Sequence, residues 1–327
     1  MSTPSLGKGD GSSGSVLELR EVSKNFGDFK AVDEVSFSLS PGSICGFLGP
    51  NGAGKTTTIR MILDIIKPTT GSIRVLGHAS ALEVRRRLGY LPEEKGLYKK
   101  MKTWAVVAYF ATLKGLSRRA ARQRACELLE KYGLKEFAKK PTEALSKGMS
   151  QKVQVLASLV HDPELVILDE PFSGLDPVNQ QVMEEIIHDI AGRGRTVLFS
   201  THVMQHAERL CDRIVLLAKG RKIFDGTIAA AKRTFPRRVR IETEDSIAPL
   251  EQLGEVAAVR LLTVPNGEAH PNGSQQWELE LHEQADPQAV LQACFAQRIR
   301  LHSFNQSDPT LHEVFVRLVG TQAKEAS

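Results

Sequence analysis

The chain has 327 residues, a length that suits two domains, the first of them large enough for a complete α/β core. Its net charge of +5 fits nucleic acid, an anionic membrane surface or a phosphate-rich ligand equally well, so charge selects none of them. The four cysteines form no Cys-x-x-Cys pair, which argues against a disulfide framework or a zinc site, and no apolar run approaches the roughly 18 residues of a membrane-spanning helix. We therefore expect a soluble protein of a reducing, cytosolic compartment.

Short β-rich runs and helical patterns follow the Gly- and Ser-rich segment 1–15, which we expect to be a disordered tail. The runs 16–22 and 34–40 alternate apolar and polar residues, as half-exposed antiparallel strands do. Three further runs are continuously apolar, as buried parallel strands are: 43–49, 164–170 and 196–200. Each of these three is followed by a helical pattern: 55–67, 179–191 and 203–210.

A long stretch between the first two parallel strands, from Lys102 to His161, contains almost only helical patterns. Together with the strands, it predicts an α/β domain over residues 16–234. This domain has a parallel-sheet core, an antiparallel edge sheet and an inserted helical subdomain at about residues 93–163.

The character of the chain changes after Thr234, where strand-like runs and helical candidates follow the order β-α-β-β-α-β. The strand-like runs are 237–243, 255–264, 275–281 and 298–304, the helical candidates are 246–253 and 287–297, and a last helix is predicted over 309–320. This order predicts an α+β accessory domain of the ferredoxin-like, split βαβ type over 235–327. Because the domain carries no catalytic pattern, a regulatory or dimerising module and a structural buttress both fit it.

The segment "GPNGAGKTTT" follows a buried strand and opens a helix, which is the context that the phosphate-binding pattern G-x-x-x-x-G-K-[ST] requires. Its glycines let backbone N–H groups turn toward phosphate oxygens, and the helix N-terminus adds a favourable dipole. Lys55 can reach the β and γ phosphates, and the Thr56 hydroxyl can ligate Mg²⁺. We predict that nine residues bind the phosphates: Gly49, Pro50, Asn51, Gly52, Ala53, Gly54, Lys55, Thr56 and Thr57.

The segment "LVILDEP" places two carboxylates where a buried strand ends. Asp169 would hold Mg²⁺ through water, and Glu170 would point toward the γ phosphate and orient the attacking water. His202, in "STHV", ends a third parallel strand, at the edge where open α/β sheets bind their ligands. A lone histidine is more often structural, but this position favours a contact with the γ phosphate.

The phosphate-binding loop (P-loop), "LSKGM", "LVILDEP", "SGLD" and "STH" follow one another in this order, and together they resemble the ATP-binding subunit of an ABC transporter. The resemblance covers about residues 16–234 and is strongest to the ATPases of drug- and sodium-exporting systems. Those proteins also have an extra C-terminal domain, and their usual partner is a separate membrane permease.

The resemblance implies roles for single residues. Phe26, in "KNFG", matches an aromatic that stacks on adenine, although a core phenylalanine would read the same way. Glu170 would be the general base, His202 the γ-phosphate sensor, and Asp176 the residue that couples the two sites of a dimer.

The segment "LSKGM" matches the family's signature motif, in which Ser146 and the Gly148 backbone would reach the γ phosphate of ATP bound to a second subunit. It departs from the usual LSGGQ, because Lys147 replaces the first glycine and Met149 the glutamine. Lys147 is counted among the ATP-binding residues, and it either keeps a positive charge near the phosphates or faces solvent. A second departure is Glu93, which stands where the family places a glutamine. A carboxylate there can still ligate Mg²⁺ but cannot donate a hydrogen bond.

The implied function is that of an ATPase subunit, with ATP and Mg²⁺ as cofactors, which powers an exporter through ATP-driven dimerisation. Its partners would be an integral-membrane permease and a second copy of the chain or a paralogous ATPase subunit, and it would lie peripherally on the cytoplasmic face of the cell membrane. The segment after Glu93 offers Leu97, Tyr98, Met101 and Trp104 either for docking of the permease or for the core of the helical subdomain. The alternative is a soluble ABC-type ATPase that acts on nucleic acid or ribosomes. Such proteins usually carry two motif sets or a long coiled-coil insertion, neither of which occurs in this sequence, so no nucleic-acid partner is expected.

Overall fold

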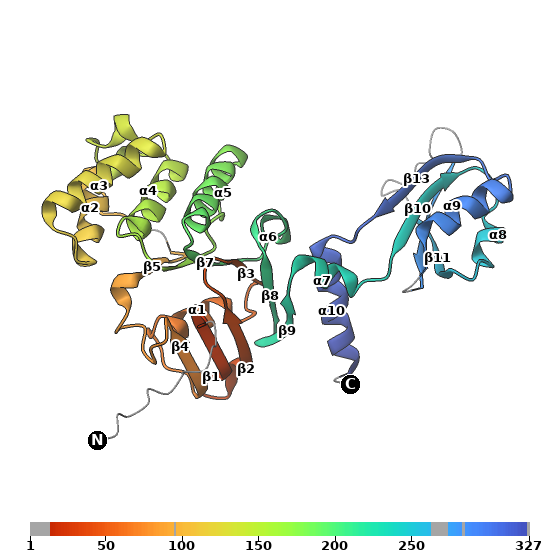
Figure 1. Cartoon of the computed structure of the whole chain (residues 1–327), viewed down its shortest axis with the longest axis horizontal. Coiled ribbons are helices and arrows are strands. Elements are labelled where there is room, and N and C mark those ends of the chain that lie inside the picture. Colours follow the sequence, from red (N-terminus) through yellow and green to blue (C-terminus); the bar gives the residue numbers. More distant parts are fainter. Residues whose placement is uncertain (1–13, 95, 263–273, 283–284, 326–327) are drawn as a thin grey trace, which may run out of the picture. The chain divides into compact units, whose positions relative to one another are not determined.

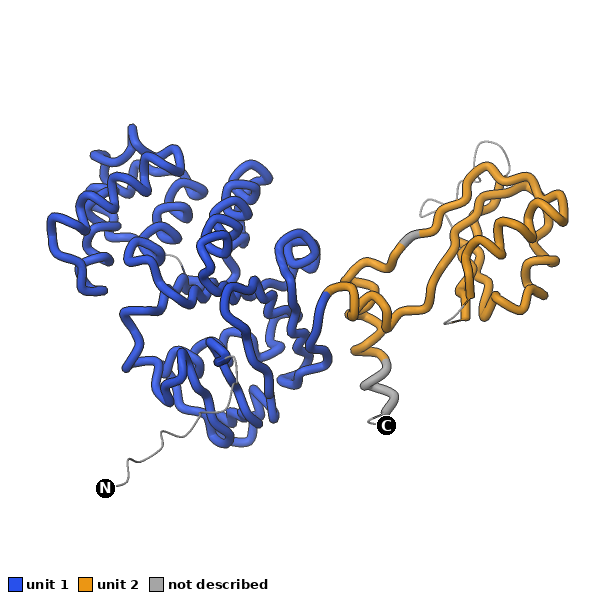
Figure 2. The backbone as a smooth tube through the Cα atoms, in the orientation of Figure 1, with its two compact units in different colours: residues 1–227 blue, residues 228–327 orange. Residues whose placement is uncertain are grey.

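The computed structural model describes residues 14–94, 96–262, 274–282 and 285–325. Most of the expected tail, and the end of the strand expected over 255–264, therefore lie outside the described residues. The chain forms two compact units, Met1–Thr227 and Ile228–Ser327, which Figure 2 shows in blue and orange.

A six-stranded sheet, five of whose strands are parallel, forms the centre of the first unit (Figure 1). In order across the sheet the strands are β5 (Leu88–Leu91), β6 (Leu165–Asp169), β7 (Thr196–Thr201), β3 (Ile44–Leu48), β8 (Arg213–Ala218) and the antiparallel β9 (Arg221–Gly226). β3, β6 and β7 are buried along their whole length, which explains why their sequences are continuously apolar. The predicted parallel core is confirmed.

The predicted antiparallel edge sheet is also confirmed, with the strand order β2-β1-β4. Its strands are β1 (Leu17–Phe26), β2 (Phe29–Leu39) and β4 (Thr70–Val75). Phe37 of β2 and Phe47 of β3, whose ring centroids are 5.5 Å apart, belong to one apolar core shared by the two sheets. This core fixes the edge sheet beside the strand that leads into the P-loop.

The helix that follows the P-loop is shorter than predicted. α1 (Lys55–Ile62) ends at Ile62 rather than at Lys67. Asp64 adopts a left-handed backbone conformation with φ of 60°, which a continuing α-helix does not allow. Its carboxylate accepts a hydrogen bond from the Ser80 hydroxyl and forms an ion pair with Lys67, so local contacts replace the last turns of the helix.

Five further α-helices, α2 to α6, belong to the first unit. They are α2 (Thr103–Leu113), α3 (Arg118–Lys131) and α4 (Lys147–Leu159) in the helical subdomain, and α5 (Pro177–Gly192) and α6 (Met204–Leu210) after β6 and β7. The first three enclose an apolar core of their own, whereas α5 buries Met183, Ile186, Ile187 and Ile190 against the large sheet. Asp176 caps α5 by accepting the Asn179 N–H, and Pro177 occupies its first position.

The second unit contains a four-stranded antiparallel sheet of order β11-β12-β10-β13. Its elements are α7 (Ile228–Arg233), β10 (Arg238–Thr243), α8 (Ala248–Glu251), β11 (Val256–Leu262), β12 (Gln275–Leu281), α9 (Pro287–Ala296), β13 (Leu301–Ser307) and α10 (Leu311–Glu325). α8 and α9 bury one face of the sheet around a separate apolar core. The predicted ferredoxin-like order is confirmed. None of the helices in the described parts of the chain has both the length and the apolar character needed to cross a bilayer.

A histidine two residues beyond the end of α4 gives the fold a defined response to acid. His161 donates from Nε2 to the Leu88 carbonyl oxygen at 2.9 Å, while its Nδ1 is buried without a partner. Burial is the main reason that the pKa of His161 falls from its ordinary 6.5 to about 4. Between pH 6.5 and 4 the His161 imidazole is protonated in the unfolded chain but stays neutral in the folded protein. Protonation therefore favours the unfolded chain, and the free energy of unfolding decreases as pH falls through this range.

We predict that His161→Gln, whose amide can still donate to Leu88, makes unfolding less dependent on pH. The thermal midpoints of both proteins should be measured at about pH 7.5 and about pH 5, where the wild type should lose more stability than the variant. Equal losses in the two proteins would contradict the assignment.

Candidate active site

Three of the predicted motifs meet at one edge of the large sheet. β3, which leads into the P-loop, lies beside β7, which in turn lies beside β6. The parallel register aligns Leu48 with Thr201 and Asp169 with Ser200, so the three strands end at the same level. The P-loop, the two carboxylates and His202 therefore open onto a common space.

The P-loop needs glycine where the backbone passes close to its neighbours. A Cβ on Gly49 would lie 2.4 Å from the Leu217 carbonyl oxygen, and one on Gly54 would lie 2.7 Å from that of Ala31. Gly54 also has φ of 96° and forms the N-cap of α1. The glycine pattern is thus explained by backbone approach, and it leaves the N-terminus of α1 facing the common space.

Lys55 is buried, with 6% of its surface exposed, and its ammonium group points back into the loop. Its Nζ donates to the Gly49 carbonyl oxygen at 2.7 Å and to that of Pro50 at 3.2 Å, and lies 3.5 Å from Glu170 Oε1. A cation held in this way can exchange its contacts with carbonyl oxygens for contacts with phosphate oxygens.

Asp169 is almost fully buried and only partly satisfied. Its Oδ1 accepts from the Ser200 hydroxyl and lies 3.5 Å from Thr56 Oγ1, while Oδ2 is buried without a hydrogen-bond partner. Burial raises the pKa of Asp169, and the two hydroxyls oppose that rise. An unpartnered carboxylate oxygen beside a hydroxyl fits a hard cation such as Mg²⁺, which prefers oxygen ligands.

Glu170 is held in a strained conformation between two nitrogen groups. Its backbone has φ of 49°, its N–H donates to Ser200 Oγ at 2.9 Å, and its Oε2 lies 3.0 Å from His202 Nδ1. Strain of this kind costs about 1–3 kcal/mol and persists where neighbouring contacts fix it. The carboxylate thus lies between Lys55 and the half-exposed His202.

The start of α4 belongs to a second cluster. The Ser146 hydroxyl accepts the Met149 N–H at 3.2 Å, which caps the helix. A Cβ on Gly148 would lie 2.4 Å from Asn179 Nδ2, and the same Nδ2 donates to Asp176 Oδ2 at 2.6 Å. The signature segment and the loop before α5 therefore pack as one piece.

Lys147, the departure from the usual signature, lies over this loop. A Cβ on Gly174 would come within 2.5 Å of its Nζ. Lysine thus occupies the space that a side chain at position 174 would need.

Two predicted residues stand apart from the clusters. Phe26 ends β1 and is 51% exposed, with Lys24 Nζ 5.2 Å from its ring centroid, so it is not a core residue. Glu93 is exposed, and no hydrogen bond among the described residues joins it to Thr56 or Asp169. The hydrogen bonds of the site connect Thr56 with Asp169 and, through Ser200, Asp169 with Glu170.

Sequence reasoning missed two residues that organise these clusters. Ser200 binds Asp169 through its hydroxyl and accepts the Glu170 N–H, and Asn179 connects Gly148 with Asp176. Ser200 begins the segment "STHV" two residues before His202, so the sequence offered a signal for it. Asn179 follows an ordinary helix start and gave none.

Comparisons with known proteins place these clusters in a family. Residues 32–173 match the family model described as "ABC transporter", and residues 226–319 match "ATP-binding protein DrrA1-3-like, C-terminal domain". The chain is 37% identical to the uncharacterized ABC transporter ATP-binding protein YhaQ of Bacillus subtilis, over 93% of this chain and 99% of that protein.

Two further relatives agree. The chain is 38% identical to the Nod factor export ATP-binding protein I of Burkholderia orbicola, over 64% of this chain and 70% of that protein. A solved structure described as an ATP-binding subunit of an ABC transporter has a TM-score of 0.62 and 32% identity, and the match covers 67% of this chain and 93% of that one.

We predict that Gly148→Ala lowers ATP hydrolysis by about tenfold or more, because the new methyl group displaces the Asn179 amide and removes one of the two hydrogen bonds that Asn179 donates to Asp176. Asn179→Ala alone should cost less, since it removes one hydrogen bond without a clash. The double variant Gly148→Ala/Asn179→Ala should recover part of the loss, measured as steady-state phosphate release. If Gly148 were needed only for close approach of the nucleotide, the double variant would be no better than Gly148→Ala.

Proposed function

The chain belongs to the ATP-binding subunits of ABC transporters, and on that premise we propose that it powers a membrane exporter through ATP-driven pairing of two such subunits. Proteins of this family bind nucleotide, hydrolyse ATP and work with membrane permeases. The observation that carries the proposal is the cluster of Lys55, Glu170 and His202 at the end of β3, β6 and β7.

Each residue of this cluster has a distinct task. Lys55 binds β and γ phosphate oxygens once ATP replaces the Gly49 and Pro50 carbonyls. Glu170 accepts a proton from the attacking water, and its left-handed backbone aims the carboxylate at the space beside the P-loop. His202 holds Glu170 Oε2 in place through Nδ1, and its other ring nitrogen, Nε2, would contact the γ phosphate.

Thr56 and Asp169 are the residues that would hold Mg²⁺, for which the orphaned Asp169 Oδ2 is the support. The ion would neutralise charge on the phosphates as the bond to the γ phosphate breaks. Glu93 remains a proposed third ligand on its sequence position alone.

We assign the export direction from the relatives. The Nod factor export protein and the linearmycin resistance protein of Bacillus subtilis share this domain, and the second of these matches 95% of the chain at 32% identity. The alternative function on nucleic acid or ribosomes has no support among these relatives. An ATP-binding subunit of such an exporter would lie on the cytoplasmic face of the membrane, bound to its permease.

We propose that the permease docks between α2 and α3. Met101, Trp104 and Tyr109 line a cavity of about 810 Å³ there, and the Arg122 guanidinium lies 5.0 Å from the Trp104 ring centroid. An amphipathic helix fits such a groove of apolar side chains with basic ones at its rim. Of the other predicted docking residues, Tyr98 is exposed, whereas Leu97 packs against the core of the helical subdomain.

We propose that the signature cluster acts on the ATP of the second subunit. Among the described residues, no hydrogen bond or ion pair joins Ser146, Lys147 or Gly148 to the P-loop of the same chain. The N-terminus of α4, which Ser146 caps at the Met149 N–H, would attract an anion through its helix dipole as that of α1 does. Two anion sites for one triphosphate are most simply supplied from two sides.

Glu170→Gln should keep ATP binding and lose most hydrolysis, about a hundredfold or more, because an amide cannot accept the proton. Loss of one negative charge beside the γ phosphate should also stabilise an ATP-bound dimer. Phosphate release and size-exclusion chromatography with ATP and Mg²⁺ measure the two effects, with Glu184→Gln as a matched control outside the site. Wild-type turnover by Glu170→Gln would remove the assignment.

Mixing two inactive variants tests pairing in trans. Gly148→Asp damages only the signature, and Lys55→Ala damages only the P-loop, so a mixed dimer has one site with both lesions and one with neither. We expect mixing to restore part of the ATPase rate, with a maximum near equal amounts. Native mass spectrometry should confirm that mixed dimers form. If they form and no ATPase activity returns at any ratio, the proposal that each site is built from two subunits and works independently is contradicted.

A further inference from the structure

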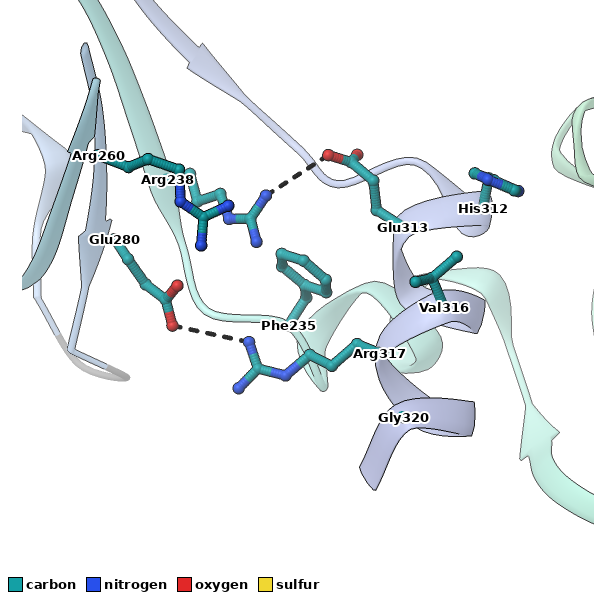
Figure 3. A pocket seen from close by; sticks show the side chains of 9 residues that line it. All are labelled: Phe235, Arg238, Arg260, Glu280, His312, Glu313, Val316, Arg317 and Gly320. Carbon is teal, nitrogen blue, oxygen red and sulfur yellow. Dashed lines mark hydrogen bonds and ion pairs between the residues drawn. The ribbon is translucent and has the colours of Figure 1, made fainter. Parts of the chain in front are cut away.

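The second unit contains a cavity of about 720 Å³ between the outer face of its sheet and α10. Figure 3 shows Arg238, Arg260 and Glu280 of the sheet pointing toward Glu313 and Arg317 of α10, with Phe235 between them. A volume of this size is typical of sites for small organic ligands. Neither the sequence motifs nor the proposed function uses it.

Most of the charged groups around this cavity already have partners. Arg238 pairs with Glu278 at 3.3 Å and with Glu313 at 3.5 Å, and Arg317 pairs with Glu280 at 3.7 Å. The two guanidinium groups also lie over the Phe235 ring, 4.1 Å and 5.1 Å from its centroid. These contacts hold the two arginines in fixed positions.

Two donors are left without an acceptor. Arg260 has neither a hydrogen bond nor an ion pair among the described residues, and Arg238 Nε is buried without a partner. Positive groups outnumber negative ones among the described charged residues of this network, which are Arg238, Arg240, Arg260 and Arg317 against Glu278, Glu280 and Glu313. An unmatched guanidinium is a strong donor to an oxyanion, which it can bind through two parallel N–H groups.

Apart from His312, the remainder of the lining is apolar. Val316 is 56% exposed on α10, and the arginine side chains that line the cavity carry hydrocarbon stems as well as charged ends. Gly320 lines the cavity too, and a Cβ there would meet nothing within 4 Å. A ligand can therefore place an apolar body against α10 while its acidic group contacts the sheet.

We propose that this cavity binds an organic anion that carries an apolar body next to its acidic group, with Arg260 as the principal contact of that group. Binding here does not depend on the proposed ATPase function, because every lining residue belongs to the second unit. The site gives the accessory domain a ligand of its own.

The full chain without nucleotide should be titrated with 2-naphthoate, and with 2-naphthalenemethanol as the uncharged analogue, by isothermal calorimetry. We expect one naphthoate to bind per chain. The alcohol should bind at least about tenfold more weakly, because it cannot form the charged hydrogen bonds. Arg260→Ala should weaken naphthoate binding by about tenfold. Arg300→Ala is the matched control, since it removes an exposed arginine of the same unit that does not line this cavity.

Gly320→Phe provides a second test that leaves every charge in place. The new ring has room to enter the cavity, so the variant should fold with an unchanged thermal midpoint and lose naphthoate binding. The proposal is overturned if wild-type protein does not bind naphthoate, if Arg260→Ala and Gly320→Phe bind it as tightly as wild type, or if Arg300→Ala loses as much as Arg260→Ala. Displacement of naphthoate by an equal concentration of inorganic phosphate would overturn the apolar half of the site.

Discussion

The parallel pairing of β6, β7 and β3 is the constraint on which the active site depends. These strands are far apart in the sequence, and only their common register brings Lys55, Asp169, Glu170 and His202 to one edge. The arrangement has an energetic cost, because two neighbouring carboxylates are buried there and one of them has a strained backbone. The Lys55 ammonium, the Ser200 hydroxyl and the packing of three fully buried strands offset it.

Much of this arrangement could be predicted from the sequence. The P-loop could be located because its glycines stand where the backbone passes close to its neighbours. The carboxylates could be located because they stand at the end of an apolar strand. The β-α-β-β-α-β order of the second unit followed from alternation of strand and helix patterns. In each case the signal lies within a few consecutive residues.

The remaining features depend on contacts between distant segments. The left-handed backbone of Glu170 and its link to Ser200 arise from the pairing of β6 with β7, which local patterns do not encode. The early end of α1 depends on Ser80, which approaches Asp64 only in the folded chain. The arginine cluster of the second unit likewise appears only in the folded unit, where side chains of α10 meet those of the sheet: Glu313 with Arg238, and Arg317 with Glu280.

The contact of Lys147 with Gly174 bears on how such domains can exchange parts. A lysine at the first position of the signature glycine pair occupies the volume beside Gly174, and Gly148 makes room for Asn179 in the same way. The helix start and the loop before α5 are therefore sterically matched to each other across the helical subdomain and the sheet. A chimera that imports the signature segment from a relative with glycine at position 147 would lose the contact of Lys147 with the loop, whereas a side chain at position 174 would require this lysine to move. Recombination that preserves these contacts would have to transfer the start of α4 and the loop before α5 together.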